Sequence, residues 1–147
     1  MLPKISFGEY RMEAIKKIEE NVPVIQTLLQ HFEAGSAELL GCVTEDIDLR
    51  IEHYRDDTDV SWQRAESIQG LVALLGRLTA EIFPQGTKIL GLDCRHLGDG
   101  WYQTEFVQTF WYPLEEQKVV GRSLFISHEA QGKVDFLREI VTSVEPA

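Results

Sequence analysis

Residues 88–142 read KILGLDCRHLGDGWYQTEFVQTFWYPLEEQKVVGRSLFISHEAQGKVDFLREIVT. Short segments that contain Gly or Pro divide this stretch at 98–100, 113–116 and 130–132. Turn residues between runs of β-branched and aromatic residues are typical of antiparallel hairpins. The stretch therefore predicts four consecutive strands, over 88–97, 101–112, 118–128 and 133–142.

The residues before this stretch favour helices. Apolar side chains recur at helical spacing over 9–34, which forms one kinked helix or two, over 37–43, and over 64–83. Apolar and charged residues alternate strictly over 47–52, which predicts a strand, and a short strand is expected over 60–63. Helices followed by a strand meander indicate an α+β fold, with the helices packed on one face of a curved antiparallel sheet.

Composition narrows the classes of function. The chain of 147 residues suits a single domain over 1–147. It has 24 acidic and 14 basic residues, a net charge of −10, which argues against nucleic acid and anionic lipid as partners. No apolar run approaches the ~18 residues of a membrane span, and residues 1–10 lack the features of a signal peptide.

The cysteines and glycines predict neither a metal site nor a cofactor. Cys42 and Cys94 stand far apart, and no Cys or His pair has metal-ligand spacing. Gly86, Gly91 and Gly98 do not form a dinucleotide fingerprint. We therefore expect two free thiols and a cytoplasmic protein.

The order of the elements resembles the NTF2-like superfamily and, within it, the SnoaL-like branch. The matching residues are Phe32-Glu33-Ala34-Gly35 with Leu39-Leu40 and Thr44-Glu45-Asp46-Ile47, the segment 66–71 with Phe83-Pro84, and the segment 131–139. The resemblance covers about residues 22–142. It implies a strongly curved mixed or antiparallel sheet that wraps around the helices as a cone, with an internal apolar pocket.

Alternation along the strands predicts which side chains enter this pocket. In the strand over 101–112 we expect the face of Phe106 to point inward; in the opposite phase Glu105 would enter the pocket. Over 88–96, the expected inward residues are Leu90, Leu92 and Cys94. The predicted pocket-lining residues are Leu49, Ile51, Leu75, Leu92, Tyr102, Thr104, Phe106, Phe110 and Leu137.

Two enzyme groups of the superfamily imply catalytic positions. The limonene epoxide hydrolases would place an Arg-x-Asp pair and a second Asp on strands of the sheet, and these positions hold Phe106, Gln108 and Glu139 here. Their water-binding Tyr and Asn positions hold Leu49 and Ile51. The ketosteroid isomerase positions are also unfilled: Ile51 stands at the base, Leu28 at the Tyr, and Ser123 or Leu124 at the second acid.

Glu139 and Gln108 therefore remain as the candidate catalytic residues. Desolvation raises the pKa of a carboxyl in an apolar cavity, which suits proton transfer near neutral pH. The alternative for Glu139 is a structural ion pair or an exposed position at the pocket rim. His53 and Tyr54, at the end of a strand, are weaker candidates for the pocket mouth.

Two functions fit these residues. The first is binding of a small hydrophobic molecule, with or without its conversion by a cofactor-independent isomerase, cyclase or hydrolase. The second is a dimeric scaffold or protein-interaction module without catalysis. Trp101, Val107 and Trp111 share the face expected to point outward, which predicts a homodimer through the outer face of the sheet.

Overall fold

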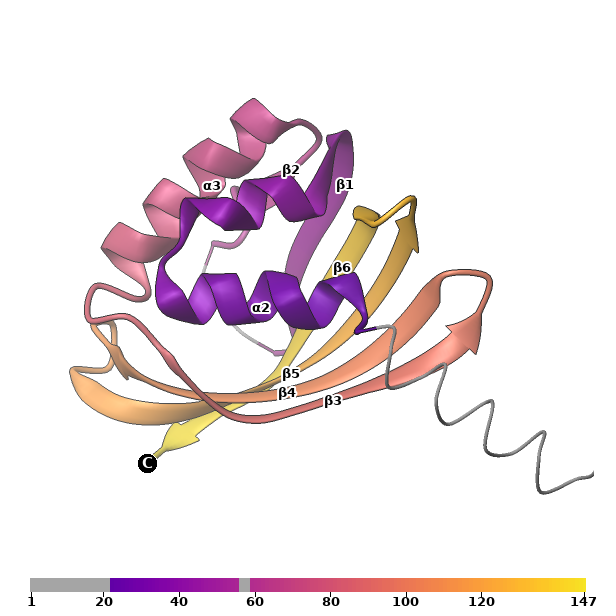
Figure 1. The fold of residues 1–147 in the computed structure, drawn as a ribbon. Helices are drawn as coiled ribbons and strands as arrows, with labels where there is room; N and C mark the ends of the chain where they lie inside the picture. Colours follow the sequence, from indigo (N-terminus) through magenta and orange to yellow (C-terminus); the bar gives the residue numbers. More distant parts are fainter. Residues whose placement is uncertain (1–21, 56–58) are drawn as a thin grey trace, which may run out of the picture.

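The computed structural model describes residues 22–55 and 59–147 (Figure 1). The elements in these residues are α2 (Val24–Ala34), the 3₁₀ helix η1 (Ala37–Cys42), β1 (Val43–His53), β2 (Arg64–Ala65), α3 (Ile68–Glu81), β3 (Lys88–Gly98), β4 (Trp101–Tyr112), β5 (Gln117–Ala130) and β6 (Lys133–Pro146). The part of the predicted helix over 9–21 lies outside the described residues. No helix in the described ranges is long and apolar enough to cross a membrane.

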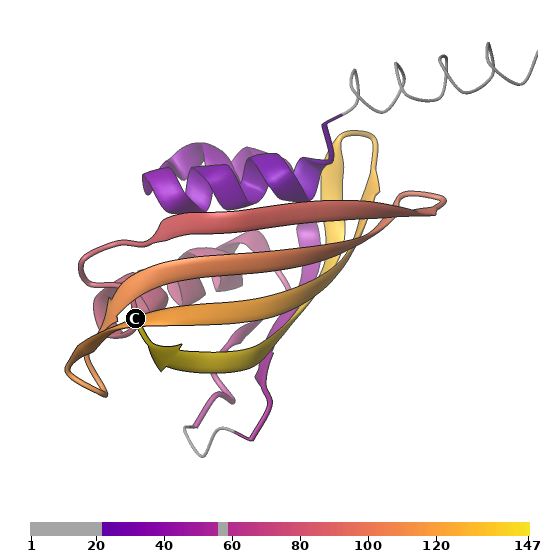
Figure 2. The same ribbon diagram turned by 90° about the horizontal axis from the view of Figure 1, so that it is seen from below.

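One six-stranded mixed sheet forms the body of the fold. Its strand order is β2-β1-β6-β5-β4-β3, with β3 to β6 antiparallel and β1 parallel to β6. The predicted meander of four strands is confirmed. The sheet is strongly curled without closing, and α2, η1 and α3 lie on its concave side (Figure 1). Figure 2 shows α2 running along β3.

Two amphipathic helices cover the concave face. The buried residues of α2 and α3 recur at helical spacing: Ile25, Leu28, Leu29, Leu71, Leu74 and Leu78. They belong to one apolar core that includes Val43 and Ile47 of β1 and Phe125 of β5. Burying each such side chain stabilises the fold by roughly 1.5–3 kcal/mol, so the helices are fixed mainly by packing on the sheet.

The helix predicted over 64–83 begins four residues later than expected. Ser67 is the N-cap of α3, and its Oγ accepts a hydrogen bond from the backbone N–H of Gly70 at 3.0 Å. Arg64 and Ala65 are extended and pair with β1 as β2. The short strand therefore lies at 64–65 and not at 60–63, because the residues before the cap are free to join the sheet.

The inward phase of β3 also differs from the prediction at one residue. Leu90 was expected to face the pocket, but its side chain is exposed. The register shifts there, because Ile89 pairs with Gln108 whereas Gly91 pairs with Val107. This β-bulge turns Leu90 outward, and Ile89 packs against the core in its place.

Candidate functional site

The concave face of the sheet and the two helices enclose a cavity of about 110 Å³. The helices contribute Leu and Phe side chains to the wall, among them Leu28, Phe32 and Leu75. β4, β5 and β6 contribute the floor. The curled sheet cannot be filled completely by the helices packed on it, and such a concave apolar space is the usual form of a small-molecule site.

Most of the predicted site residues line this cavity. They are Leu49, Ile51, Leu75, Phe106, Gln108, Phe110, Leu137 and Glu139. Burial along β4 agrees with the inward phase of Phe106, which is 2% exposed, whereas Glu105 faces solvent. Glu105 therefore does not replace Glu139 as the acid of the cavity.

Three predicted lining residues, Leu92, Tyr102 and Thr104, are not part of the cavity wall. Leu92 and Tyr102 pack against the apolar core. Leu92 lies in the middle of β3 opposite Phe106, and Tyr102 lies near the turn between β3 and β4. Thr104 is fully buried, and its Oγ1 lies 3.4 Å from Cys94 Sγ. All three side chains are directed toward the core side of the sheet, although they do not border the cavity.

Glu139 places a carboxyl group inside the cavity. Its neighbours across the sheet are Ile51 of β1 and Phe125 of β5. Burial among these apolar groups raises the pKa of Glu139 from 4.5 to about 7. The Ser123 hydroxyl donates a hydrogen bond to the carboxylate, which lowers the pKa by less than burial raises it.

Gln108 also lines the cavity, but the structure does not bring it next to Glu139. Glu139 pairs with Phe125, and Phe125 pairs with Thr104, so Gln108 lies four residues farther along β4 and two strands away. Strand geometry puts the two Cα atoms roughly 15 Å apart. Gln108 Oε1 instead accepts a hydrogen bond from Thr87 Oγ1 at 2.7 Å. The predicted catalytic pair is therefore two separate polar positions.

His53 lies closer to Glu139 than Gln108 does. It continues the inward alternation of β1 after Leu49 and Ile51, and it lines the cavity. His53 pairs with Val141 across β1 and β6, two residues along from Glu139. Its Nε2 lies 2.6 Å from Oε1 of the buried Gln63, which can only accept, so Nε2 carries the proton. From the sequence, His53 is predicted at the pocket mouth, although the alternation of apolar residues before it indicates the inner face.

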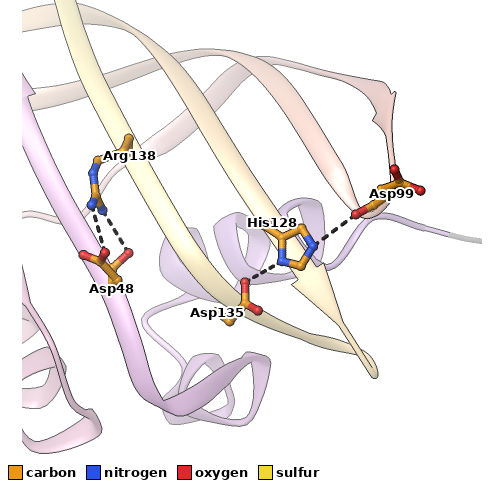
Figure 3. A network of polar contacts seen from close by, with 5 residues as sticks. All are labelled: Asp48, Asp99, His128, Asp135 and Arg138. Atoms are coloured by element: carbon orange, nitrogen blue, oxygen red, sulfur yellow. Dashed lines mark hydrogen bonds and ion pairs between the residues drawn. The ribbon is translucent and has the colours of Figure 1, made fainter.

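A second polar cluster lies outside the cavity, at the hairpin ends of the sheet (Figure 3). His128 Nδ1 is 2.7 Å from Asp135 Oδ1, and Nε2 is 3.1 Å from the backbone oxygen of Asp99. The hydrogen bond with the Asp135 carboxylate is the main cause that raises the pKa of His128. Nearby, Arg138 Nη2 and Asp48 Oδ2 form an ion pair at 3.0 Å. Both contacts join neighbouring strands.

Solved structures with the same architecture identify the fold. An NTF2-like protein from Anabaena variabilis superposes with a TM-score of 0.65 at 15% identity, over 82% of this chain and 87% of that chain. The chain has the NTF2-like fold. A candidate polyketide cyclase from Xanthomonas campestris gives a TM-score of 0.64 at 12% identity, over 80% of this chain and 86% of that chain. A candidate isomerase from Rhodopseudomonas palustris gives a TM-score of 0.58 at 13% identity, over 81% of this chain and 86% of that chain. No family model and no curated protein matches the sequence.

Within this NTF2-like fold, the cavity offers one titratable acid in a mostly apolar wall. Phe106 packs edge-on against Phe125, with ring centroids 5.6 Å apart, and so acts as wall rather than as a polar group. The polar side chains of Glu139, Ser123 and His53 line neighbouring positions of the sheet, and Gln63 contacts His53 there. This arrangement can bind an apolar molecule and exchange a proton with it.

Proposed function

We propose that the protein binds a small, mostly hydrophobic molecule in the cavity and that Glu139 exchanges a proton with it. The observation that carries this proposal is a carboxyl group with a pKa of about 7 inside an apolar cavity. Near neutral pH such a group is present in both protonation states, so it can act as an acid or as a base. The proposed activity is that of a cofactor-independent isomerase, cyclase or hydrolase.

The neighbouring residues would position the reacting group. The Ser123 hydroxyl donates to the Glu139 carboxylate and thereby restricts its orientation. Gln63 holds the His53 ring at the same inner face. Proteins described as a candidate polyketide cyclase and a candidate isomerase share the fold, which supports this class of reaction without naming a substrate.

The proposal is tested first by ligand occupancy. Native mass spectrometry of the purified protein would detect a co-purified molecule, and an apolar fluorescent dye would measure binding to the cavity. We expect one dye per chain, and weaker binding in Leu75→Trp, which fills the cavity from α3. Glu105→Gln serves as the control, because it changes a carboxyl on the outer face. Equal dye binding in Leu75→Trp and the wild type would contradict the proposal.

We also propose that two copies associate through the outer face of the sheet. Three large apolar side chains of this face, Trp101, Trp111 and Ile140, are each 37% exposed. Exposed apolar residues on one surface favour an interface. Sedimentation velocity should give a dimer for the wild type and a monomer for Ile140→Lys. A monomeric wild type at micromolar concentration would argue against both this dimer and the scaffold function.

We propose further that the chain works as one domain in the reducing cytoplasm. Cys42 is buried and Cys94 partly buried, and both are free thiols. Burial raises the pKa of each thiol and so keeps it in the unreactive protonated form. Both thiols should stay reduced in protein purified without a reducing agent.

A further inference from the structure

The carboxylate of Glu139 has no counter-ion among the described residues that line the cavity. Its lining includes one acid, Glu139, and three other residues with titratable or charged side chains: Arg50 of β1, His53 of β1 and Tyr112 of β4. Arg50 is exposed. Its charge adds a minor part to the lowering of the pKa of Asp48, whose main cause is the hydrogen bond from Arg138. No basic side chain contributes to the pKa of Glu139, which responds only to burial and to Ser123. Among the described residues, the carboxylate of Glu139 therefore has no cation of its own.

Aromatic rings make up much of the remaining wall. They are Phe32, Phe83, Phe106, Phe110, Tyr112 and Phe125. Phe83 contacts Phe32 and Phe110 edge to face, with centroids 5.3 Å and 4.6 Å apart. The negative face of an aromatic ring attracts a cation, and more strongly where water is excluded.

We propose that the ligand of this cavity carries a basic amine, which binds as an ammonium ion with Glu139 as its counter-ion. The inference rests on the proposed function, since it names the chemistry of the molecule bound there. A carboxylate in an apolar cavity without a counter-ion is unfavourable, and an ammonium group would supply that counter-ion. A ligand with a carboxylate or phosphate would instead bring a like charge to Glu139.

Binding would change the protonation of Glu139. The amine enters as an ammonium ion, and the neutral carboxyl releases its proton to solvent, so a carboxylate faces an ammonium in the complex. The net charge of −10 on the chain favours the approach of cations over anions. The aromatic wall would hold the apolar body of the ligand.

The test compares molecules that differ only in charge. Two sets serve, one on a benzyl and one on a naphthylmethyl skeleton, each with the primary amine, the alcohol and the carboxylic acid. Calorimetry at pH 8 would measure the Kd of each compound. We expect the amine to bind at least about tenfold more tightly than the alcohol, and the acid not to bind.

Variants and the pH dependence of binding show whether Glu139 causes the preference for the amine. Glu139→Gln should remove the preference for the amine, whereas Glu105→Gln should keep it. Because the carboxyl must release a proton, the amine should bind about 100-fold more weakly at pH 5 than at pH 8. His53→Gln removes the imidazole that faces the cavity and should keep most of this dependence.

Each of the following results would overturn the inference. If an alcohol binds as tightly as its amine, or if Glu139→Gln keeps the preference, the inference is wrong while the proposed binding function stands. If no compound of either set binds but the apolar dye does, the inference is wrong while the proposed binding function stands; if the dye does not bind either, both are wrong. A pH dependence that disappears in His53→Gln but not in Glu139→Gln would assign the effect to the imidazole and would also overturn the inference.

Discussion

Replacing Glu139 by Gln should make the protein more stable at alkaline pH. The substitution keeps the shape of the side chain and an oxygen for the Ser123 hydroxyl, but it removes the ionisable group. In the wild type the folded protein binds the proton of Glu139 more tightly than the unfolded chain does, because the pKa rises from 4.5 to about 7 on folding. The free energy of unfolding therefore falls as pH rises from 4.5 to 7, and this loss levels off above pH 7.

The size of this effect follows from the two pKa values. The difference between 4.5 and about 7 corresponds to about 3 kcal/mol when the carboxyl is ionised in both states. At pH 5 the loss amounts to about 1 kcal/mol, because the carboxyl in the unfolded chain is already largely ionised there. Between pH 5 and pH 8, the free energy of unfolding of Glu139→Gln should therefore rise by about 2.5 kcal/mol relative to that of the wild type.

Urea unfolding at a series of pH values would measure this gain. The wild type and the variant share all other titrating groups, so the difference between their free energies of unfolding isolates Glu139. Glu105→Gln provides the matched control and should differ from the wild type by the same small amount at every pH. A difference for Glu139→Gln that stays constant from pH 5 to pH 8 would refute the view that the carboxyl is desolvated in the cavity.

Three further predictions concern the framework of the fold. His128→Gln should lower stability below pH 6.5 and converge on the wild type as pH rises through the raised pKa of His128, measured by thermal unfolding across pH. Ser67→Ala should cost about 1 kcal/mol in urea unfolding, because the N-cap bond to Gly70 is lost; no change would argue against that cap. Gly100→Ala should disrupt the β3–β4 turn, since φ is +82° and a Cβ would lie 2.3 Å from the backbone oxygen of Glu129. Nuclear magnetic resonance spectra with unchanged turn resonances would contradict this last prediction.

The hairpins were predictable because their signals are local. Gly98-Asp99-Gly100 lies between two runs of strand-forming residues, and in the structure Asp99 and Gly100 both adopt positive φ, as a tight two-residue turn requires. The inward face of β4 followed from the same kind of signal. With Phe106 facing inward, strict alternation along the strand predicts that Gln108 and Phe110 also face inward.

The features that could not be predicted from the sequence depend on strand register and on packing between elements. The bulge at Leu90 leaves no clear signal in the residue types around it, and one extra residue reverses the predicted face. Alternation placed Gln108 and Glu139 on the same face of the sheet. It could not show that they lie four residues apart along the strands, because that offset comes from the pairing of β4 with β5 and of β5 with β6.

The position of Glu139 is the strongest reason to look for a ligand. A Leu or Gln at this place on β6 would avoid the loss of about 3 kcal/mol that the ionised carboxyl brings at neutral pH and above. The Ser123 hydroxyl offsets only part of the desolvation of that carboxyl. A group that costs stability where it lies is typical of a functional site, where the partner that compensates it arrives only on binding. For a carboxylate among aromatic rings, the partner that restores most of the lost free energy is a cation, since it supplies the charge that the cavity wall lacks.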